Sequence, residues 1–446
     1  MTQDILLPDF EAAPATPGAS GSLNLKFGTD EEFARLRTLF QEVGYTERGV
    51  CARVGCPDMS RFVTRLGVVI EDALEVCIQL FLEGEPVARS MADKLLPPGA
   101  PAFLTEFGLL APDPGDPGNY VAPLSLYEAQ GLYLISDQTV LVAGTGGRTV
   151  PDDVVYPAIQ ATTAEFLEAM PNTHCERLLD ICSGTGVAAL YAASTFADHA
   201  WAVDITERST QVCEFNARLN GVENVTALTG DLFAPVAGLT FDRIVAHPPY
   251  MPATENKVIF RDGGEDGEQL TRRIIEALPD HLARGGRFYC RCMATDRQGA
   301  PLEERLRALL GPRHEEFDIL IVFNVEAPPA LFYSRLVARG SMTPAEYARQ
   351  VEVLKTLAVE KMVIGFISIE RRPSSQAAVT LRRCIMQRRS PAPAEIDWGL
   401  AWERAQNDPG LLSRLLSARP VLSPFAEVQL KHRMHAGQLR AEQCTA

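Results

Sequence analysis

The stretch R-L-L-D-I-C-S-G-T-G, at Arg177–Gly186, decides the fold of this chain. A short apolar run is followed by an acid, by a turn with two glycines and then, at Val187–Phe196, by a segment of helical character. A strand, a turn and a helix in this order hold a small ligand above the end of the strand. A second stretch, F-D-R-I-V-A-H-P-P-Y at Phe241–Tyr250, lies further along the chain. Most of the functional interpretation depends on these two stretches.

Around these stretches, apolar runs alternate with segments of helical periodicity, after a helical segment predicted at residues 152–170. Strands are predicted at residues 177–182, 200–205, 225–229, 243–246, 286–293, 319–324 and 362–370, and helices at residues 187–196, 207–220, 267–283, 302–310 and 345–359. This alternation predicts an α/β fold with a Rossmann-like, doubly wound and mostly parallel sheet. The last two strands, separated by a long insertion, would close the sheet as an antiparallel pair. Within one strand, the alternation Cys290-Arg291-Cys292 is typical of a half-buried strand.

The chain is predicted to divide into four parts: a flexible leader (1–25), a mainly helical, winged-helix-like domain (26–150), the sheet domain (151–372) and a C-terminal extension (373–446). In the second part, helices are predicted at residues 29–43, 47–54, 59–69, 73–82, 87–96 and 102–110, and a hairpin of two strands at residues 120–127 and 131–135. Residues 1–150 contain 10 Lys and Arg against 20 Asp and Glu. Because a DNA-binding domain needs a basic face, a substrate-docking domain or a structural cap is favoured.

The bulk composition is that of a soluble globular protein, with 46% apolar residues, 22% charged residues and a net charge of −15 over 446 residues. No apolar run reaches the roughly 18 residues of a membrane span, and the N-terminus lacks a signal-peptide pattern, so we expect a cytoplasmic protein without membrane contact. The acidity makes nucleic acid a less favoured partner. The 10 cysteines include no C-x-x-C pair, and His432, His435 and Cys444 are an incomplete ligand set, so no metal is expected.

The glycine turn of the first stretch fits the pattern G-x-G-x-x-A, with Gly184, Gly186 and Ala189 opening a helix. Dinucleotide enzymes share this pattern, but their pyrophosphate lies over the turn, where the carboxylate of Asp180 would oppose its charge. A ligand with an ammonium and a sulfonium group, and without phosphate, would instead be favoured there. The ligand predicted from this reasoning is S-adenosyl-L-methionine. Its predicted contacts in this stretch are Asp180, Cys182, Ser183, Gly184 and Gly186.

Two further acids lie at the ends of the next two predicted strands. Asp204 ends the second strand, 18 residues after Gly186, where an acid can accept both ribose hydroxyls. Asp231 follows the third strand, where an acid can accept a hydrogen bond from the adenine amino group. The apolar neighbours Ile205 and Leu232 can enclose the adenine ring. Each acid alone is common as a helix cap or turn residue, but three at consecutive strand ends indicate a cofactor site.

Together, D-x-C-S-G-T-G, A-V-D, G-D-L-F and H-P-P-Y resemble the class I S-adenosylmethionine-dependent methyltransferases with an N-P-P-Y signature after the fourth strand. The segment Arg261–Gly286 is similar to the same region of the release-factor glutamine N5-methyltransferases. The resemblance covers residues 170–300 well and residues 300–372 loosely. It implies a seven-stranded methyltransferase sheet and transfer of a methyl group to nitrogen. The N-terminal part differs from the short helical bundle of those enzymes.

The resemblance also implies roles for the residues of H-P-P-Y. In that family the Asn side chain and the next proline carbonyl accept hydrogen bonds from a planar nitrogen, and the aromatic residue stacks on the substrate. These roles pass to Pro248 for the carbonyl and to Tyr250 for stacking, with Pro249 beside the substrate. His247 replaces Asn, next to both cofactor and substrate. An imidazole accepts a hydrogen bond only when it is neutral, and it can also serve as a general base.

His247 therefore favours a substrate that loses a proton, such as an amine, a guanidine, a ring nitrogen or an oxygen nucleophile; alternatively, it only packs beside the cofactor. The function predicted from the sequence is an S-adenosylmethionine-dependent N-methyltransferase acting on a protein side chain or on a small amine, guanidine or amide metabolite. Two alternatives remain at this point: an RNA or DNA base methyltransferase, and a non-catalytic binding protein with the cofactor fold. The sequence leaves the oligomeric state open.

Overall fold

The computed structural model describes residues 17–18, 23–65, 67–138, 150–253, 259–338, 340, 342–373, 377–385, 393–406, 410–417, 419, 429–435 and 438–445. By its internal contacts the chain forms two compact units, Met1–Leu400 and Ala401–Ala446. Most of the predicted leader, residues 1–25, lies outside the described residues. The boundaries predicted at residues 150 and 372 fall inside the first unit, and the division into four parts stays a prediction.

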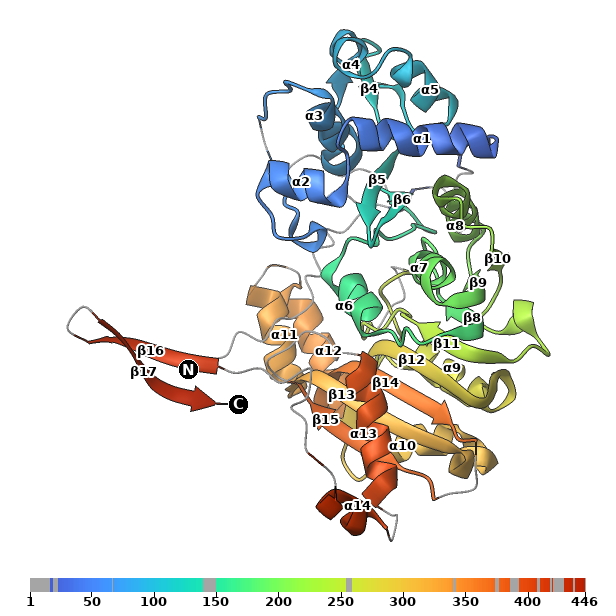
Figure 1. Cartoon of the computed structure of the whole chain (residues 1–446), viewed down its shortest axis with the longest axis vertical. Coiled ribbons are helices and arrows are strands. Elements are labelled where there is room, and N and C mark those ends of the chain that lie inside the picture. Colours follow the sequence, from blue (N-terminus) through green and yellow to red (C-terminus); the bar gives the residue numbers. More distant parts are fainter. Residues whose placement is uncertain are drawn as a thin grey trace. The chain divides into compact units, whose positions relative to one another are not determined.

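The N-terminal part of the first unit contains a winged helix (Figure 1). Its helices are α1 (Asp30–Glu42), α2 (Glu47–Val54), η1 (Met59–Arg61), α3 (Ala73–Cys77) with a π-helical continuation η2 (Ile78–Glu83), α4 (Arg89–Leu95) and α5 (Ala100–Glu106), and its strands are β2 (Val87–Ala88), β3 (Ala111–Pro112) and β4 (Asn119–Val121). Strand β4 pairs antiparallel with both β2 and β3. Residues 111–121 thus form the wing, and the hairpin predicted at residues 120–127 and 131–135 is confirmed by the later strands β5 (Leu124–Ala129) and β6 (Leu132–Asp137), with its start shifted. Pro123 interrupts the predicted strand because proline has no N–H to donate.

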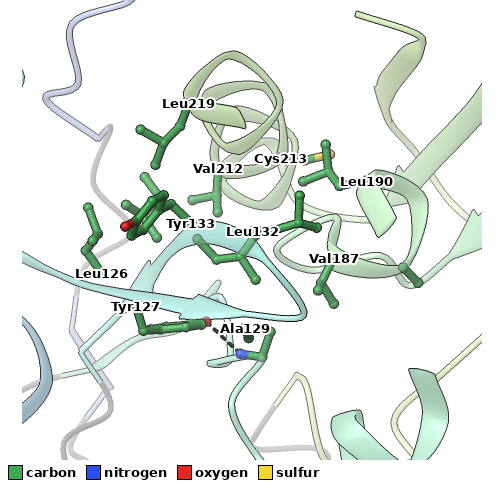
Figure 2. Packing of buried hydrophobic residues seen from close by; sticks show 14 of the residues in the cluster. Leu126, Tyr127, Ala129, Leu132, Tyr133, Val187, Leu190, Val212, Cys213 and Leu219 are labelled. Atoms are coloured by element: carbon green, nitrogen blue, oxygen red, sulfur yellow. Dashed lines mark hydrogen bonds between the residues drawn. The ribbon is translucent and has the colours of Figure 1, made fainter. Parts of the chain in front are cut away.

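A separate hairpin joins this part to the sheet domain. Strands β5 (Leu124–Ala129) and β6 (Leu132–Asp137) are antiparallel. Figure 2 shows apolar side chains of the hairpin packed against those of α7 (Val187–Thr195) and α8 (Glu207–Asn220). The buried Asn216 of α8 bonds the main-chain N–H and carbonyl of Ile135 at 2.7 and 3.3 Å, and it also donates to the Thr185 carbonyl at 3.0 Å. One residue therefore connects the N-terminal part with the glycine turn.

The centre of the first unit is an eight-stranded, mostly parallel sheet. Its strands are β8 (Cys175–Ile181), β9 (Ala197–Asp204), β10 (Val225–Thr229), β11 (Phe241–Ala246), β12 (Leu282–Arg297), β13 (Phe317–Ala327), β14 (Val359–Arg371) and β15 (Thr380–Cys384), in the order β10-β9-β8-β11-β12-β14-β13-β15. Strands β13 and β14 form the predicted antiparallel pair, and β14 is also antiparallel to β12. The prediction of seven strands was wrong by one, because the edge strand β15 is short and carries two arginines instead of an apolar run.

Helices cover both faces of this sheet (Figure 1). Besides α7 and α8, they are α6 (Ala161–Ala169), η3 (Ala234–Val236), α9 (Gln269–His281), α10 (Leu302–Leu309), η4 (Gly311–Glu316), α11 (Pro329–Ala338), α12 (Pro344–Thr356) and α13 (Pro393–Gln406), which ends in the second unit. Adjacent residues of β8 show the two layers, because Leu178 packs with α7 and α8 whereas Leu179 packs with α9 and α10. The helix predicted at residues 152–170 begins only at Ala161, since Pro157 disfavours helix before it.

Two smaller pieces complete the described structure. The two-residue strands β1 (Pro17–Gly18) and β7 (Val150–Pro151) pair in parallel. The second unit contains α14 (Leu411–Ser417) and the antiparallel hairpin of β16 (Gln429–His435) and β17 (Gln438–Thr445). Within the described ranges, none of the helices combines the length and apolar character that a membrane span requires.

Candidate active site

The carboxyl ends of four parallel strands meet at one edge of the sheet. The register places Ile181 of β8 beside Val203 of β9 and beside Ala246 of β11. The residues that follow these three positions are the first of the glycine turn, Asp204 and His247. The structure therefore brings the two stretches chosen from the sequence to the same place.

The glycine turn after β8 has a backbone that few residues adopt. Cys182, Gly184 and Gly186 have φ angles of 61°, 53° and 77°, and the Ser183 carbonyl accepts the Gly186 N–H at 2.8 Å. A β-carbon on Gly186 would lie 2.2 Å from the sulfur of Cys213 in α8, so only glycine permits this packing. A β-carbon on Gly184 would meet no atom within 4 Å. The turn is thus fixed against α8 and open beside Gly184.

Asp180 lies beneath the turn and is 2% exposed. Its Oδ2 accepts the N–H of Ala189, in the first turns of α7, at 3.2 Å. Burial, with a smaller contribution from the charge of Asp204, raises the pKa of Asp180 to about 8, although the Ala189 hydrogen bond opposes this rise. Without a cation beside it, the carboxyl is therefore mostly protonated at neutral pH. Its predicted contact with a ligand ammonium group stays a prediction.

The half-buried Asp204 connects the end of β9 to the glycine turn. Its Oδ2 accepts the Gly184 N–H at 2.9 Å, and its Oδ1 accepts the Thr206 N–H at 3.2 Å. Burial raises the pKa of Asp204, and these two hydrogen bonds counteract part of that rise. The next residue, Ile205, is 53% exposed. An acid and an exposed apolar side chain thus stand side by side at the end of β9.

The third predicted acid has different surroundings. Asp231 is exposed, and its Oδ2 forms an ion pair with Arg273 of α9 at 2.6 Å. The next residue, Leu232, is buried with a φ of 50°, which is uncommon for a residue with a side chain. Arg273 was not singled out in the sequence, because its position in α9 does not reveal which strand end it reaches. The predicted contact of Asp231 with adenine stays a prediction.

These residues fit S-adenosylmethionine by their chemistry. The contacts of Asp204 with the ribose hydroxyls, and of Ile205 and Leu232 with the adenine ring, stay predictions; of the two apolar side chains, Ile205 is exposed and Leu232 is buried. The open space beside Gly184, above the buried Asp180, suits the part that carries the ammonium group.

The H-P-P-Y loop is braced by the segment that follows it. The Met251 N–H donates to the Arg261 carbonyl, and the Gly263 N–H donates to the Met251 carbonyl, each at 2.8 Å. A β-carbon on Gly263 would lie 2.8 Å from the Pro249 carbonyl oxygen, so glycine allows this close approach. The glycine-rich segment thereby fixes the backbone that follows β11.

His247 is half-buried between aromatic rings. Its ring centre lies 5.3 Å from that of Phe166 in α6 and 5.7 Å from that of Tyr250. Within the described part of the chain, nothing hydrogen-bonds to the imidazole or to the Pro248 carbonyl. Burial, reinforced by the positive charge of Arg291, lowers the pKa of His247 to about 3. The neutral ring offers a hydrogen-bond acceptor, and this low pKa favours that role over a general base that retains a proton.

Arg291, which contacts this loop, and its ion-pair partner Glu165 were both missed in the sequence. Arg291 of β12 donates to the Tyr250 hydroxyl at 2.8 Å and to the Glu165 carboxylate of α6 at 2.5 Å. The half-buried strand predicted at Cys290-Arg291-Cys292 is wrong, because α6 covers the second face and all three residues are at most 2% exposed. The sequence feature that could have revealed Arg291 was its position, as a charged residue, inside an otherwise apolar strand. Tyr250 is itself buried, and its predicted stacking on a substrate stays a prediction.

Residues 156–311 match the family described as methyltransferase small domain. This matched segment, residues 156–311, is similar to a methyltransferase domain. The predicted resemblance to glutamine methyltransferases agrees with the names of two relatives that are similar in sequence. A ribosomal protein uL3 glutamine methyltransferase of Bradyrhizobium diazoefficiens is 38% identical over 131 residues, which cover 26% of this chain and 41% of the relative. A release factor glutamine methyltransferase of Thermodesulfovibrio yellowstonii is 30% identical over 125 residues, covering 25% and 45%.

The chain thus spans less than half the length of either relative. The match to a methyltransferase family is in accord with the predicted cofactor, S-adenosylmethionine. Among the described residues, no group of three or more His, Cys, Asp and Glu side chains is arranged to hold a metal ion.

Proposed function

We propose that the chain is an S-adenosylmethionine-dependent N-methyltransferase that acts on an uncharged side-chain nitrogen of a protein, a carboxamide in the first place. The observation that carries this proposal is a pair of neighbouring hydrogen-bond acceptors, the His247 ring and the Pro248 carbonyl, to which no described residue donates. A carboxamide nitrogen carries two N–H donors and matches two acceptors. The names of the two relatives, both glutamine methyltransferases, support the same acceptor class.

The charge around His247 also supports an uncharged acceptor. The guanidinium of Arg291 is buried, and it contributes to the low pKa of His247. A lysine ammonium or an arginine guanidinium would meet this like charge in a site of low dielectric constant, where repulsion is strong. The N-terminal part would bind the protein substrate. Because it has more Asp and Glu than Lys and Arg, it suits a basic protein better than a nucleic acid.

The bound cofactor supplies an electrophilic methyl group, and the side chains of the site orient the acceptor toward it. The Pro248 carbonyl and the neutral His247 ring accept the two N–H groups, so the nitrogen lone pair is directed away from both. The nitrogen–carbon bond forms as the carbon–sulfur bond breaks, and the nitrogen then loses one proton. Because His247 has a pKa of about 3, that proton passes to solvent. Positioning alone can supply several orders of magnitude in rate.

The test uses labelled S-adenosylmethionine and an extract of cells that lack this chain, with the label followed into protein, RNA and small molecules. We expect label in protein, on a carboxamide side chain identified by mass spectrometry. His247→Asn should retain methyl transfer within roughly tenfold, because an amide oxygen also accepts a hydrogen bond, whereas His247→Ala should lose about 100-fold. The control is His199→Asn, a half-buried histidine in β9 that bonds Thr226 at 2.9 Å.

Label in RNA or in small molecules would contradict the proposal, as would a lysine or arginine acceptor. Equal activity of His247→Ala and the unchanged protein would remove His247 from the site.

A further inference from the structure

A buried arginine stands in the middle of strand β12. Arg291 is 2% exposed and lies opposite Phe366 of the antiparallel neighbour β14, with its guanidinium 5.8 Å from that ring centre. A buried guanidinium is costly unless it is paired and hydrogen-bonded, and an apolar residue of similar size often stabilises a fold as well or better. Stability alone therefore does not account for an arginine at this position.

The Arg291 guanidinium joins two elements. Its Nε and Nη2 donate to Oε2 of Glu165 in α6, at 3.2 and 2.5 Å, and its Nη1 donates to the Tyr250 hydroxyl at 2.8 Å. The Glu165 side chain is 12% exposed, so this pair is largely shielded from water. Two donors on one carboxylate fix the orientation of the planar guanidinium, and the third then fixes the position of Tyr250.

The same arrangement reaches His247 on two sides. The Tyr250 ring lies 5.7 Å from the His247 ring with 21° between their planes. Phe166, the neighbour of Glu165 in α6, lies 5.3 Å from the His247 ring at 38°. Helix α6 thus contacts His247 directly through Phe166 and indirectly through Glu165, Arg291 and Tyr250.

We propose that Arg291, oriented by Glu165, is a positioning residue of the methyl-accepting site, which fixes Tyr250 and thereby holds the His247 ring, uncharged, in place to receive the acceptor. The role is indirect, because Arg291 contacts neither His247 nor an open surface. Among the described residues, the charged group that acts on His247 is Arg291 of β12, which is paired with Glu165 of α6; Tyr250 is the titratable neighbour on its own loop. This inference rests on the proposed function, which supplies the identity of the methyl acceptor; the contacts of Arg291 do not depend on that identity.

The first measurement needs no acceptor. The protein contains seven histidines, and His247 is assigned in the NMR spectrum of ring-labelled protein by its loss in His247→Asn. In the unchanged protein His247 should stay neutral across the physiological range. In Arg291→Gln it should titrate at a distinctly higher pH, because a nearby positive charge is removed and the loop is released. An unaltered titration in Arg291→Gln would overturn the proposal, whether or not the methyl acceptor is known.

The second measurement separates positioning from folding. The control is Arg287→Gln, on the same strand and the same face as Arg291 but away from the site, which breaks the ion pairs of Arg287 with Glu370 of β14 (3.0 Å) and with Asp397 of α13. Arg291→Gln and Glu165→Gln should lower kcat by roughly 100-fold, as displaced reacting groups do, while calorimetry shows S-adenosylhomocysteine binding within about threefold of the unchanged protein. Arg291→Lys keeps the positive charge but lacks the planar guanidinium with its several donors. Its His247 should therefore titrate as in the unchanged protein, whereas its kcat should stay nearly as low as that of Arg291→Gln.

Arg287→Gln should change neither quantity by more than about twofold. Equal losses of kcat in Arg287→Gln and Arg291→Gln would reduce Arg291 to a structural residue. So would a loss of S-adenosylhomocysteine binding as large as the loss of kcat. If no acceptor is found in any extract, the proposed function fails, and the titration alone decides the role of Arg291.

Discussion

The buried Asp180 carboxyl provides a test of how burial affects stability, because no cation of a described residue pairs with it. Its pKa rises from 3.8 to about 8 on folding, mainly through burial. Between these two values the folded chain holds a proton that the unfolded chain releases. The free energy of unfolding therefore falls as the pH rises from 4 to 8, and it levels off above 8. Asp180→Asn removes this loss, and its amide oxygen can still accept the Ala189 N–H.

The size of the effect follows from the shift. Each unit of pKa difference corresponds to about 1.4 kcal/mol, so at neutral pH the buried carboxyl costs at most about 4 kcal/mol. Relaxation of the surroundings reduces that figure, and we expect Asp180→Asn to gain about 2 kcal/mol or more near pH 8 and almost nothing near pH 4. Few single polar substitutions stabilise a protein to this extent.

Urea unfolding of the unchanged protein and of Asp180→Asn at several pH values between about 5 and 8 measures the difference. Asp93→Asn, at an exposed position in α4, is the control and should show a pH-independent difference near zero. A constant difference between Asp180→Asn and the unchanged protein across this range would refute the reasoning. We also expect weaker S-adenosylhomocysteine binding by Asp180→Asn, since a carboxylate that attracts the ligand ammonium group is lost; stability and binding would then change in opposite directions.

Three further substitutions test other parts of the site. Gly186→Ala should cost about 2–4 kcal/mol in urea unfolding, because its β-carbon would meet Cys213 and its φ is 77°. Asn216→Ala should cost about 2–4 kcal/mol and also weaken cofactor binding in calorimetry, because it leaves buried main-chain groups of β6 and the Thr185 carbonyl without a partner. Ile205→Ser should leave urea unfolding within about 0.5 kcal/mol, since its side chain is 53% exposed, but weaken S-adenosylhomocysteine binding roughly tenfold.

Much of the sheet domain could be predicted because its local signals agree with one another. Strand β10 and helix α8 have the predicted bounds, residues 225–229 and 207–220. Thr206 caps the start of α8 through its side chain, and Gly221 ends it in a left-handed conformation, both of which are short-range features. Parallel strands covered on both faces are apolar runs, and β8 to β14 were found for that reason.

Other features depend on contacts between distant residues and were missed. Arg291 and Glu165 are 126 positions apart, and Asn216 and Ile135 are 81 apart. A polar residue inside an apolar segment shows that a partner is required, but it does not identify the partner. The edge strand β15 has no apolar run, because one of its sides has no neighbouring strand. The start of α6 was predicted too early because helical periodicity outweighed a proline.

Four residues that break local rules lie at one edge of the sheet, where the sequence motifs also lie. Cys182 and Leu232 have left-handed backbones at the ends of β8 and β10. Asp180 is a buried carboxyl with no cation of a described residue beside it, and His247 is an imidazole held neutral by its surroundings. Each of these features costs on the order of 1–3 kcal/mol, and stability alone would favour replacing all four. Their common position at the ends of β8, β10 and β11 is explained if a bound ligand and an acceptor nitrogen contact these residues and recover the free energy that they cost the fold.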